Sequence, residues 1–152
     1  MPVVALDQLT KYLVRQNLEL NASVAVLGEF FRLTYVENTG IVFGIQVGSA
    51  LPLFTLFSLV ATLLIMAYFY SERTSRLAVR ISLAVLLGGA VGNLIDRLLF
   101  GRVVDFLDFG IGQYRFFVFN IADSAVTVGV ASFLLLTAYL LPRSQGVVDG
   151  ST

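Results

Sequence analysis

The sequence predicts an all-α integral membrane protein, a bundle of four transmembrane helices with a small extracytoplasmic β-cradle between the first two. Three observations predict this class. Of the 152 residues, 57% are hydrophobic and only 13% are charged, whereas soluble domains are about half apolar and about a quarter charged. The mean hydropathy is +0.86. The apolar residues also form long runs, of which residues 51–70 contain no charge and reach the roughly 20 residues that a helix needs to span a bilayer.

The elements follow from these runs and from the turn signals between them. We expect helices over residues 2–18, 51–70, 80–100 and 120–141, in a single domain covering 1–152. Residues 24–47 mix β-branched and aromatic residues with turn signals, which predicts the β-cradle. Residues 101–119 predict a mixed loop, and 144–152 a polar, disordered tail. The first helix has only a short apolar run before Asp7, so its start is expected to be clipped. It has neither the basic segment nor the cleavage site of a secretory signal peptide, so we do not expect one.

The arginines predict the orientation, because basic residues concentrate in cytoplasmic loops. Arg73, Arg76 and Arg80 lie in the short loop between the second and third predicted helices, and Arg143 follows the fourth. The arginines on the other side are spread over much longer segments. We therefore expect both termini in the cytoplasm and the two long segments outside.

Composition excludes several classes of chemistry. The chain has no cysteine and no histidine, so disulfides, a thiolate nucleophile, sulfur ligands and the commonest general base are all missing. The formal net charge is zero, which gives no electrostatic footprint for nucleic acid. An enzyme of this composition must use Asp, Glu, Lys, Ser, Thr or Tyr.

Two acids are the candidate catalytic residues. Asp105 follows the third predicted helix and Asp123 opens the fourth, both beside apolar runs at the outer membrane face. Carboxylates are costly at membrane depth, so they mark functional sites there. Two carboxylates that share a proton can act as an aspartic peptidase, one activating water and the other protonating the scissile carbonyl. No metal or other cofactor is needed. We hypothesise that Asp123 is the more readily ionised and that Asp105 more often holds the proton.

The same positions also fit purely structural roles. Asn120 followed by Asp123 has the spacing of a capping box at a helix start, and Asp105 could be a solvated loop acid. Asp108, three residues after Asp105, is a second candidate for its role, and sequence spacing does not separate the two.

Two further groups of polar residues have the spacing of one helical face. Asp7 and Lys11 are four residues apart, which fits an ion pair on one helical face. Asn93, Asp96 and Arg97 also share one helical face. They could support the two aspartates or bind a substrate carbonyl, or Asp96 and Arg97 could form an internal ion pair that holds two helices together.

Glycines mark two further positions. Gly88 and Gly92 form a small-xxx-small pair, which is typical of a close helix–helix contact. Asn38 and Gly40 fit a turn, unless they face the two aspartates.

Five motifs, taken together and in this order, resemble the lipoprotein signal peptidases, the bacterial type II signal peptidases: DQLTK, VENTGIVFG, GGAVGNLIDR, GRVVDF and FNIADSAV. They run from Asp7 to Val126, most of the chain. The resemblance implies that Asp105 and Asp123 are catalytic, which favours Asp105 over Asp108. It implies supporting roles for nine residues: Asp7, Lys11, Asn38, Gly40, Asn93, Asp96, Arg97, Asn120 and Ala122.

The resemblance also implies the substrate and the location. The substrate is a prolipoprotein whose cysteine already carries diacylglyceryl, and cleavage occurs just before that cysteine. The enzyme lies in the bacterial cytoplasmic membrane, among membrane lipids, with its active site at the outer face; it needs no cofactor or nucleic acid, and we expect a monomer. Two departures stand out: the apolar run before Asp7 is shorter than is usual in the family, and Val42 replaces a small alanine, which reshapes the substrate groove slightly.

The alternative hypothesis is a small four-helix transporter or channel whose intramembrane acids bind protons or cations. Its acids would be expected near the midplane, whereas these cluster at one face. An intramembrane aspartyl protease of the GxGD class is a further alternative, but the sequence contains no GxGD element.

Overall fold

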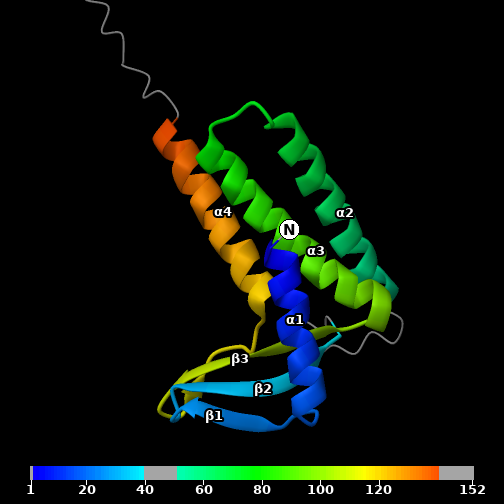
Figure 1. The fold of residues 1–152 in the computed structure, drawn as a ribbon, viewed down its shortest axis with the longest axis vertical. Helices are drawn as coiled ribbons and strands as arrows, with labels where there is room; N and C mark the ends of the chain where they lie inside the picture. The colour runs from blue at the N-terminus through cyan, green and yellow to red at the C-terminus, as the bar shows by residue number, and fades with distance from the viewer. Residues whose placement is uncertain (1, 40–50, 141–152) are drawn as a thin grey trace, which may run out of the picture.

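The computed structural model describes residues 2–39 and 51–140, which contain four helices and four strands (Figure 1). The helices are α1 (Pro2–Asn17), α2 (Leu51–Ser71), α3 (Leu77–Phe100) and α4 (Ile121–Leu140). The third helix begins three residues earlier than expected, and the fourth begins after Asn120 rather than at it. The predicted tail, Gly40 and Val42 lie outside the described residues.

Three of these helices are long and apolar enough to cross a membrane: Leu53–Ser71, Leu77–Phe100 and Ile121–Tyr139. They carry large apolar side chains on their outer surfaces, such as Leu64 and Leu135, which are 66% and 72% exposed. Such surfaces suit a lipid environment, and the chain is a multi-pass membrane protein. The helix α1 has 16 residues and is not among the three spans.

The helix α3 is the centre of the bundle, since α1, α2 and α4 all pack against it. Two glycines allow the close approach of α1. A Cβ at Gly88 would lie 2.9 Å from the Cβ of Val3, and a Cβ at Gly92 would lie 2.6 Å from Oδ2 of Asp7. The close contact predicted for this glycine pair is therefore confirmed, and its partner is α1.

The sheet lies at one end of the bundle, and the α2–α3 loop lies at the other (Figure 1). Its strands are β1 (Ser23–Leu27), β2 (Phe31–Asn38), β3 (Val103–Ile111) and β4 (Tyr114–Arg115), antiparallel and in the order β1–β2–β3–β4. The prediction of a mixed loop over 101–119 is wrong, because this segment supplies half of the sheet. The β-cradle is thus built from both outer segments and not only from the one between the first two helices.

A small apolar core joins the sheet to α1. It contains Val14 of α1, Tyr35 of β2, and Val104 and Phe106 of β3. Because Val36 pairs with Asp105 in the β2–β3 register, this core fixes the height of Asp105 relative to the helices.

Candidate active site

The two predicted aspartates come together through the side chain of Asn120. Asp105 lies on β3 and Asp123 in the first turn of α4. Nδ2 of Asn120 donates a hydrogen bond to Oδ1 of Asp105 at 2.7 Å, and Oδ1 of Asn120 accepts one from the backbone N–H of Asp123 at 2.9 Å. Asn120 is fully buried. One amide therefore fixes both acids.

Asp123 forms the predicted capping box. Its Oδ2 accepts a hydrogen bond from the backbone N–H of Asn120 at 3.2 Å, which completes the reciprocal pair. Its Oδ1 accepts a second hydrogen bond, from Nδ2 of Asn93 at 2.7 Å. From the sequence, Asp123 fits either a capping role or a position beside Asp105. In the structure, Asp123 has both.

Asp105 is buried, with 3% of its surface exposed, and each of its carboxylate oxygens has an amide donor. Asn120 donates to Oδ1, and Nδ2 of Asn38 donates to Oδ2 at 3.1 Å. Burial first, and then the negative charge of Asp123, raise the pKa of Asp105 to about 6, while the two amide hydrogen bonds and the charge of Lys11 act to lower it. Asp105 is therefore much easier to protonate than an ordinary carboxylate.

Asp108 has different partners. Oδ2 accepts a hydrogen bond from the hydroxyl of Thr34 at 2.6 Å, and Oδ1 pairs with Nε of Arg115 at 2.7 Å. Burial acts to raise the pKa of Asp108, but the hydrogen bonds from Arg115 and Thr34 outweigh it and hold the pKa below its usual range. Asp108 therefore stabilises the sheet and lies apart from the contacts of Asp105.

A buried lysine lies behind the two aspartates. Nζ of Lys11 contacts Oδ2 of Asp7 at 2.9 Å, Oδ2 of Asp96 at 3.1 Å and Oδ1 of Asn93 at 3.0 Å. Lys11, Asp7 and Asp96 have no exposed surface. The Asp7–Lys11 ion pair is thus confirmed. Because an ammonium only donates, it also forces the oxygen of Asn93 toward itself and the amide nitrogen toward Asp123.

The two buried acids hold the chain segments that carry the candidate catalytic pair. Oδ1 of Asp7 accepts a hydrogen bond from the backbone N–H of Ala122 at 2.9 Å, at the start of α4. Oδ2 of Asp96 accepts one from the backbone N–H of Val104 at 3.1 Å, at the start of β3. Asp7 and Asp96 therefore anchor the segments on either side of the site.

The sequence hypotheses missed two residues of this cluster. Gln8 donates to Oδ2 of Asp7 and to Oδ1 of Asp96, each at 3.1 Å. Arg15 lies 3.5 Å from Oδ1 of Asp96 and stacks over the ring of Phe100 at 4.0 Å. Gln8 could have been found because it follows Asp7 directly in a recognised motif. Arg15 follows Lys11 by four residues, which is the spacing of one helical face.

The ion pair suggested for Asp96 with Arg97 is wrong, because Asp96 pairs with Lys11 and Arg15 instead. The guanidinium of Arg97 is directed to a cavity of about 240 Å³ between α2, α3 and α4, beside Asp123. Its other lining residues are Ser58, Ala61, Thr62, Ile65, Ala90, Asn93 and Val126. Within residues 2–39 and 51–140, no three side chains of His, Cys, Asp or Glu are placed to hold a metal ion.

Several known proteins are similar to this chain over most of its length. Residues 1–140 match the family model described as signal peptidase (SPase) II. A lipoprotein signal peptidase of Moorella thermoacetica is 46% identical over 143 residues, covering 94% of this chain and 91% of that one. One from Staphylococcus aureus is 35% identical, covering 94% and 86%. A solved bacterial membrane enzyme has a TM-score of 0.78 and 32% identity, covering 95% of this chain and 87% of its own. The chain belongs to the signal peptidase II family.

Proposed function

We propose that the chain removes signal peptides from prolipoproteins and that Asp105 and Asp123 are its two catalytic carboxylates. The observation that carries the assignment of the residues is the buried amide of Asn120, which contacts both acids. A second carboxylate next to the buried Asp105 is costly unless polar partners hold both acids, and an aspartic peptidase needs such a pair.

The two carboxylates divide the proton transfers. Asp123, whose carboxylate completes the capping box, accepts a proton from a water as the water oxygen attacks the scissile carbonyl. Asp105, with its raised pKa, donates its proton to the carbonyl oxygen. In the second step the tetrahedral intermediate collapses, the C–N bond breaks, and the proton on Asp123 passes to the leaving amine. Asp105 recovers its proton from the hydroxyl that becomes the new carbonyl.

The cavity beside Asp123 is the proposed entry for the signal peptide. It is lined by α2, α3 and α4, and its small and apolar residues on α2, such as Ala61 and Ile65, suit an apolar helix arriving from the lipid. The substrate cysteine carries diacylglyceryl, and cleavage falls just before it. Each acyl methylene buried in the bilayer contributes roughly 0.8 kcal/mol, so the membrane itself concentrates the substrate at the site.

The other predicted residues have supporting roles in this proposal. Lys11, Asp7 and Asp96 hold the starts of β3 and α4, and Asn38 and Asn93 donate to the carboxylates. The set assigned to support is Asp7, Lys11, Asn38, Gly40, Asn93, Asp96, Arg97, Asn120 and Ala122, of which Gly40 rests on the motif alone.

The proposed topology places α1 in the membrane as the fourth helix of a single-domain monomer. The α2–α3 loop lies at the end of the bundle away from the sheet (Figure 1). Arg73 and Arg76 are in this loop and Arg80 is in the first turn of α3, which supports a cytoplasmic location for that end and for both termini. The sheet and the two aspartates then lie at the outer face of the bacterial inner membrane.

The experiment compares two versions of one prolipoprotein, with and without diacylglyceryl on the cysteine, incubated with the purified protein. Mass spectrometry of the products should show cleavage of the lipid-modified version immediately before the cysteine. Equal cleavage of the unmodified version would refute the lipid requirement, and cleavage at another bond would refute the proposed site of action.

A further inference from the structure

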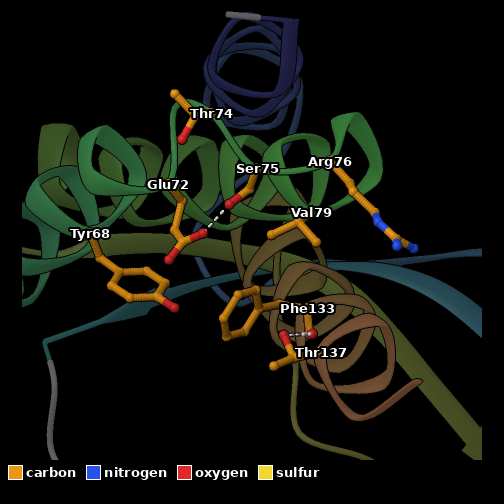
Figure 2. A pocket seen from close by; sticks show the side chains of 8 residues that line it. All are labelled: Tyr68, Glu72, Thr74, Ser75, Arg76, Val79, Phe133 and Thr137. Atoms are coloured by element: carbon orange, nitrogen blue, oxygen red, sulfur yellow. Dashed lines mark hydrogen bonds between the residues drawn. The ribbon is translucent and has the colours of Figure 1, made fainter. Parts of the chain in front are cut away.

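A second cavity lies at the end of the bundle away from the sheet, between α2, α4 and the loop before α3 (Figure 2). Its volume is about 410 Å³. The rings of Tyr68 and Phe133 meet edge to face in it, with centroids 5.7 Å apart. The remaining lining residues are Glu72, Thr74, Ser75, Arg76, Val79 and Thr137.

Glu72 is the acid among the lining residues of this cavity. It is the only acid in the sequence between Glu37 and Asp96. Among the described residues Glu72 takes part in no ion pair, and it accepts a hydrogen bond from the hydroxyl of Ser75. The neighbouring arginines are directed elsewhere: Arg73 stacks over the ring of Tyr70 at 4.5 Å, and Arg76 points away from Glu72 in Figure 2.

This cavity and the one beside Asp123 lie along the same faces of α2 and α4. Their lining residues recur every three, four or seven positions, which is the repeat of one helical face. They are Ser58, Ala61, Thr62, Ile65 and Tyr68 on α2, Glu72 in the turn directly after it, and Asp123, Val126, Phe133 and Thr137 on α4. From Asp123 to Thr137 the helix rises roughly 21 Å, at about 1.5 Å per residue.

That length matches the substrate class. A signal peptide has a positively charged amino-terminal region followed by an apolar segment of about 7–15 residues, which spans roughly 10–22 Å as a helix. A peptide bound along α2 and α4 with its cleavage site at Asp123 therefore places its basic region at Glu72.

We propose that Glu72 binds the basic side chains of the signal peptide's amino-terminal region. An ammonium or guanidinium pairs with the carboxylate, and its aliphatic stem packs on the rings of Tyr68 and Phe133. The arginines of the α2–α3 loop repel a basic peptide, so the cation is directed to Glu72, the acid that the described residues place at this end. The inference rests on the proposed function and identifies a second contact region for the same substrate.

The test is steady-state cleavage of two lipid-modified prolipoproteins that differ only in lysine or glutamine in the amino-terminal region. A zwitterionic detergent removes the contribution of a charged membrane surface. For the parent protein we expect a KM about three- to tenfold lower for the lysine substrate, in the range of an exposed ion pair with an aromatic contact. Glu72→Gln should lose most of this preference at unchanged kcat. Glu19→Gln, the same change at an exposed acid near the sheet, should keep it.

A charge reversal keeps the test decisive. Glu72→Lys should prefer a third substrate, with glutamate in the amino-terminal region, over the lysine substrate. The inference is overturned if Glu72→Gln discriminates as the parent does, or if Glu72→Lys still prefers lysine. If the parent cleaves no substrate, the proposed function itself is refuted, and this outcome is distinct from an active parent that ignores the amino-terminal charge.

Discussion

Replacing Lys11 with methionine tests the buried ionic cluster behind the two aspartates. Nζ of Lys11 has three acceptors at 2.9–3.1 Å, in Asp7, Asp96 and Asn93. Methionine has a similar length and fills the space, but it leaves two acids without their shared cation. Removing one partner of a buried ion pair costs about 3–5 kcal/mol, and we expect a loss of stability in this range.

Arg15→Met is the matched control. Its guanidinium lies 3.5 Å from the same Asp96, but the side chain is 22% exposed. An exposed pair contributes about 0–1 kcal/mol, and the stacking on Phe100 adds about 0.5–1 kcal/mol. The control should therefore lose about 0.5–2 kcal/mol, clearly less than Lys11→Met.

The assay is a denaturant titration in mixed micelles followed by circular dichroism. A triple variant in which Lys11→Met is combined with Asp7→Asn and Asp96→Asn should recover part of the loss, because neutral amides then replace the two fully buried acids and only the partly exposed Arg15 loses a partner. Equal, small effects of Lys11→Met and Arg15→Met would refute the argument that Lys11 neutralises both acids. So would a triple variant less stable than the single one.

Two further predictions concern the site and its packing. Asn38→Ala removes a hydrogen bond to the ionised form of Asp105. The pKa of Asp105 should rise from about 6, so its proton persists to higher pH and the alkaline limb of kcat/KM should move up by about 0.5–1 unit. The pH–rate profile measures this shift. The control Asn17→Ala, at an exposed position, should leave the profile unchanged. A downward shift in Asn38→Ala would contradict the assignment of Asp105 as the proton donor. Gly92→Ala would place a Cβ 2.6 Å from Oδ2 of Asp7 and should cost about 1–3 kcal/mol in the same titration; unchanged stability would show that Asp7 can move freely.

The helices could be predicted from the sequence because their signal is local. A run of apolar residues has the same meaning wherever it packs, so the ends of α2 and α4 are close to the expected positions. The strand β3 could not be predicted in this way, because it forms only by pairing with β2, which is far away in the chain. Within a strand, successive side chains point to opposite faces. Asp105 and Asp108 are three residues apart, so their side chains lie on opposite faces of the sheet. A prediction of a loop does not distinguish the two side chains in this way.

The partner of Asp96 shows a second limit. Neighbouring residues on a helix do not face each other, so helix geometry itself disfavours an ion pair between Asp96 and Arg97. The actual partners, Lys11 and Arg15, lie on α1 and become visible only once α1 packs on α3. The capping box, by contrast, is local, and the spacing of Asn120 and Asp123 predicts it.

The central claim is that Asp105 and Asp123 together carry the chemistry. The most direct test is cleavage of a diacylglyceryl-modified prolipoprotein by the purified parent protein and by Asp105→Asn, Asp123→Asn and Asp108→Asn. Loss of a general acid or base costs about 10²–10⁴-fold, so the first two variants should fall by at least about 100-fold while folded, and Asp108→Asn should keep most of the activity. Folded variants at 105 or 123 that cleave at near-parent rates would contradict the account.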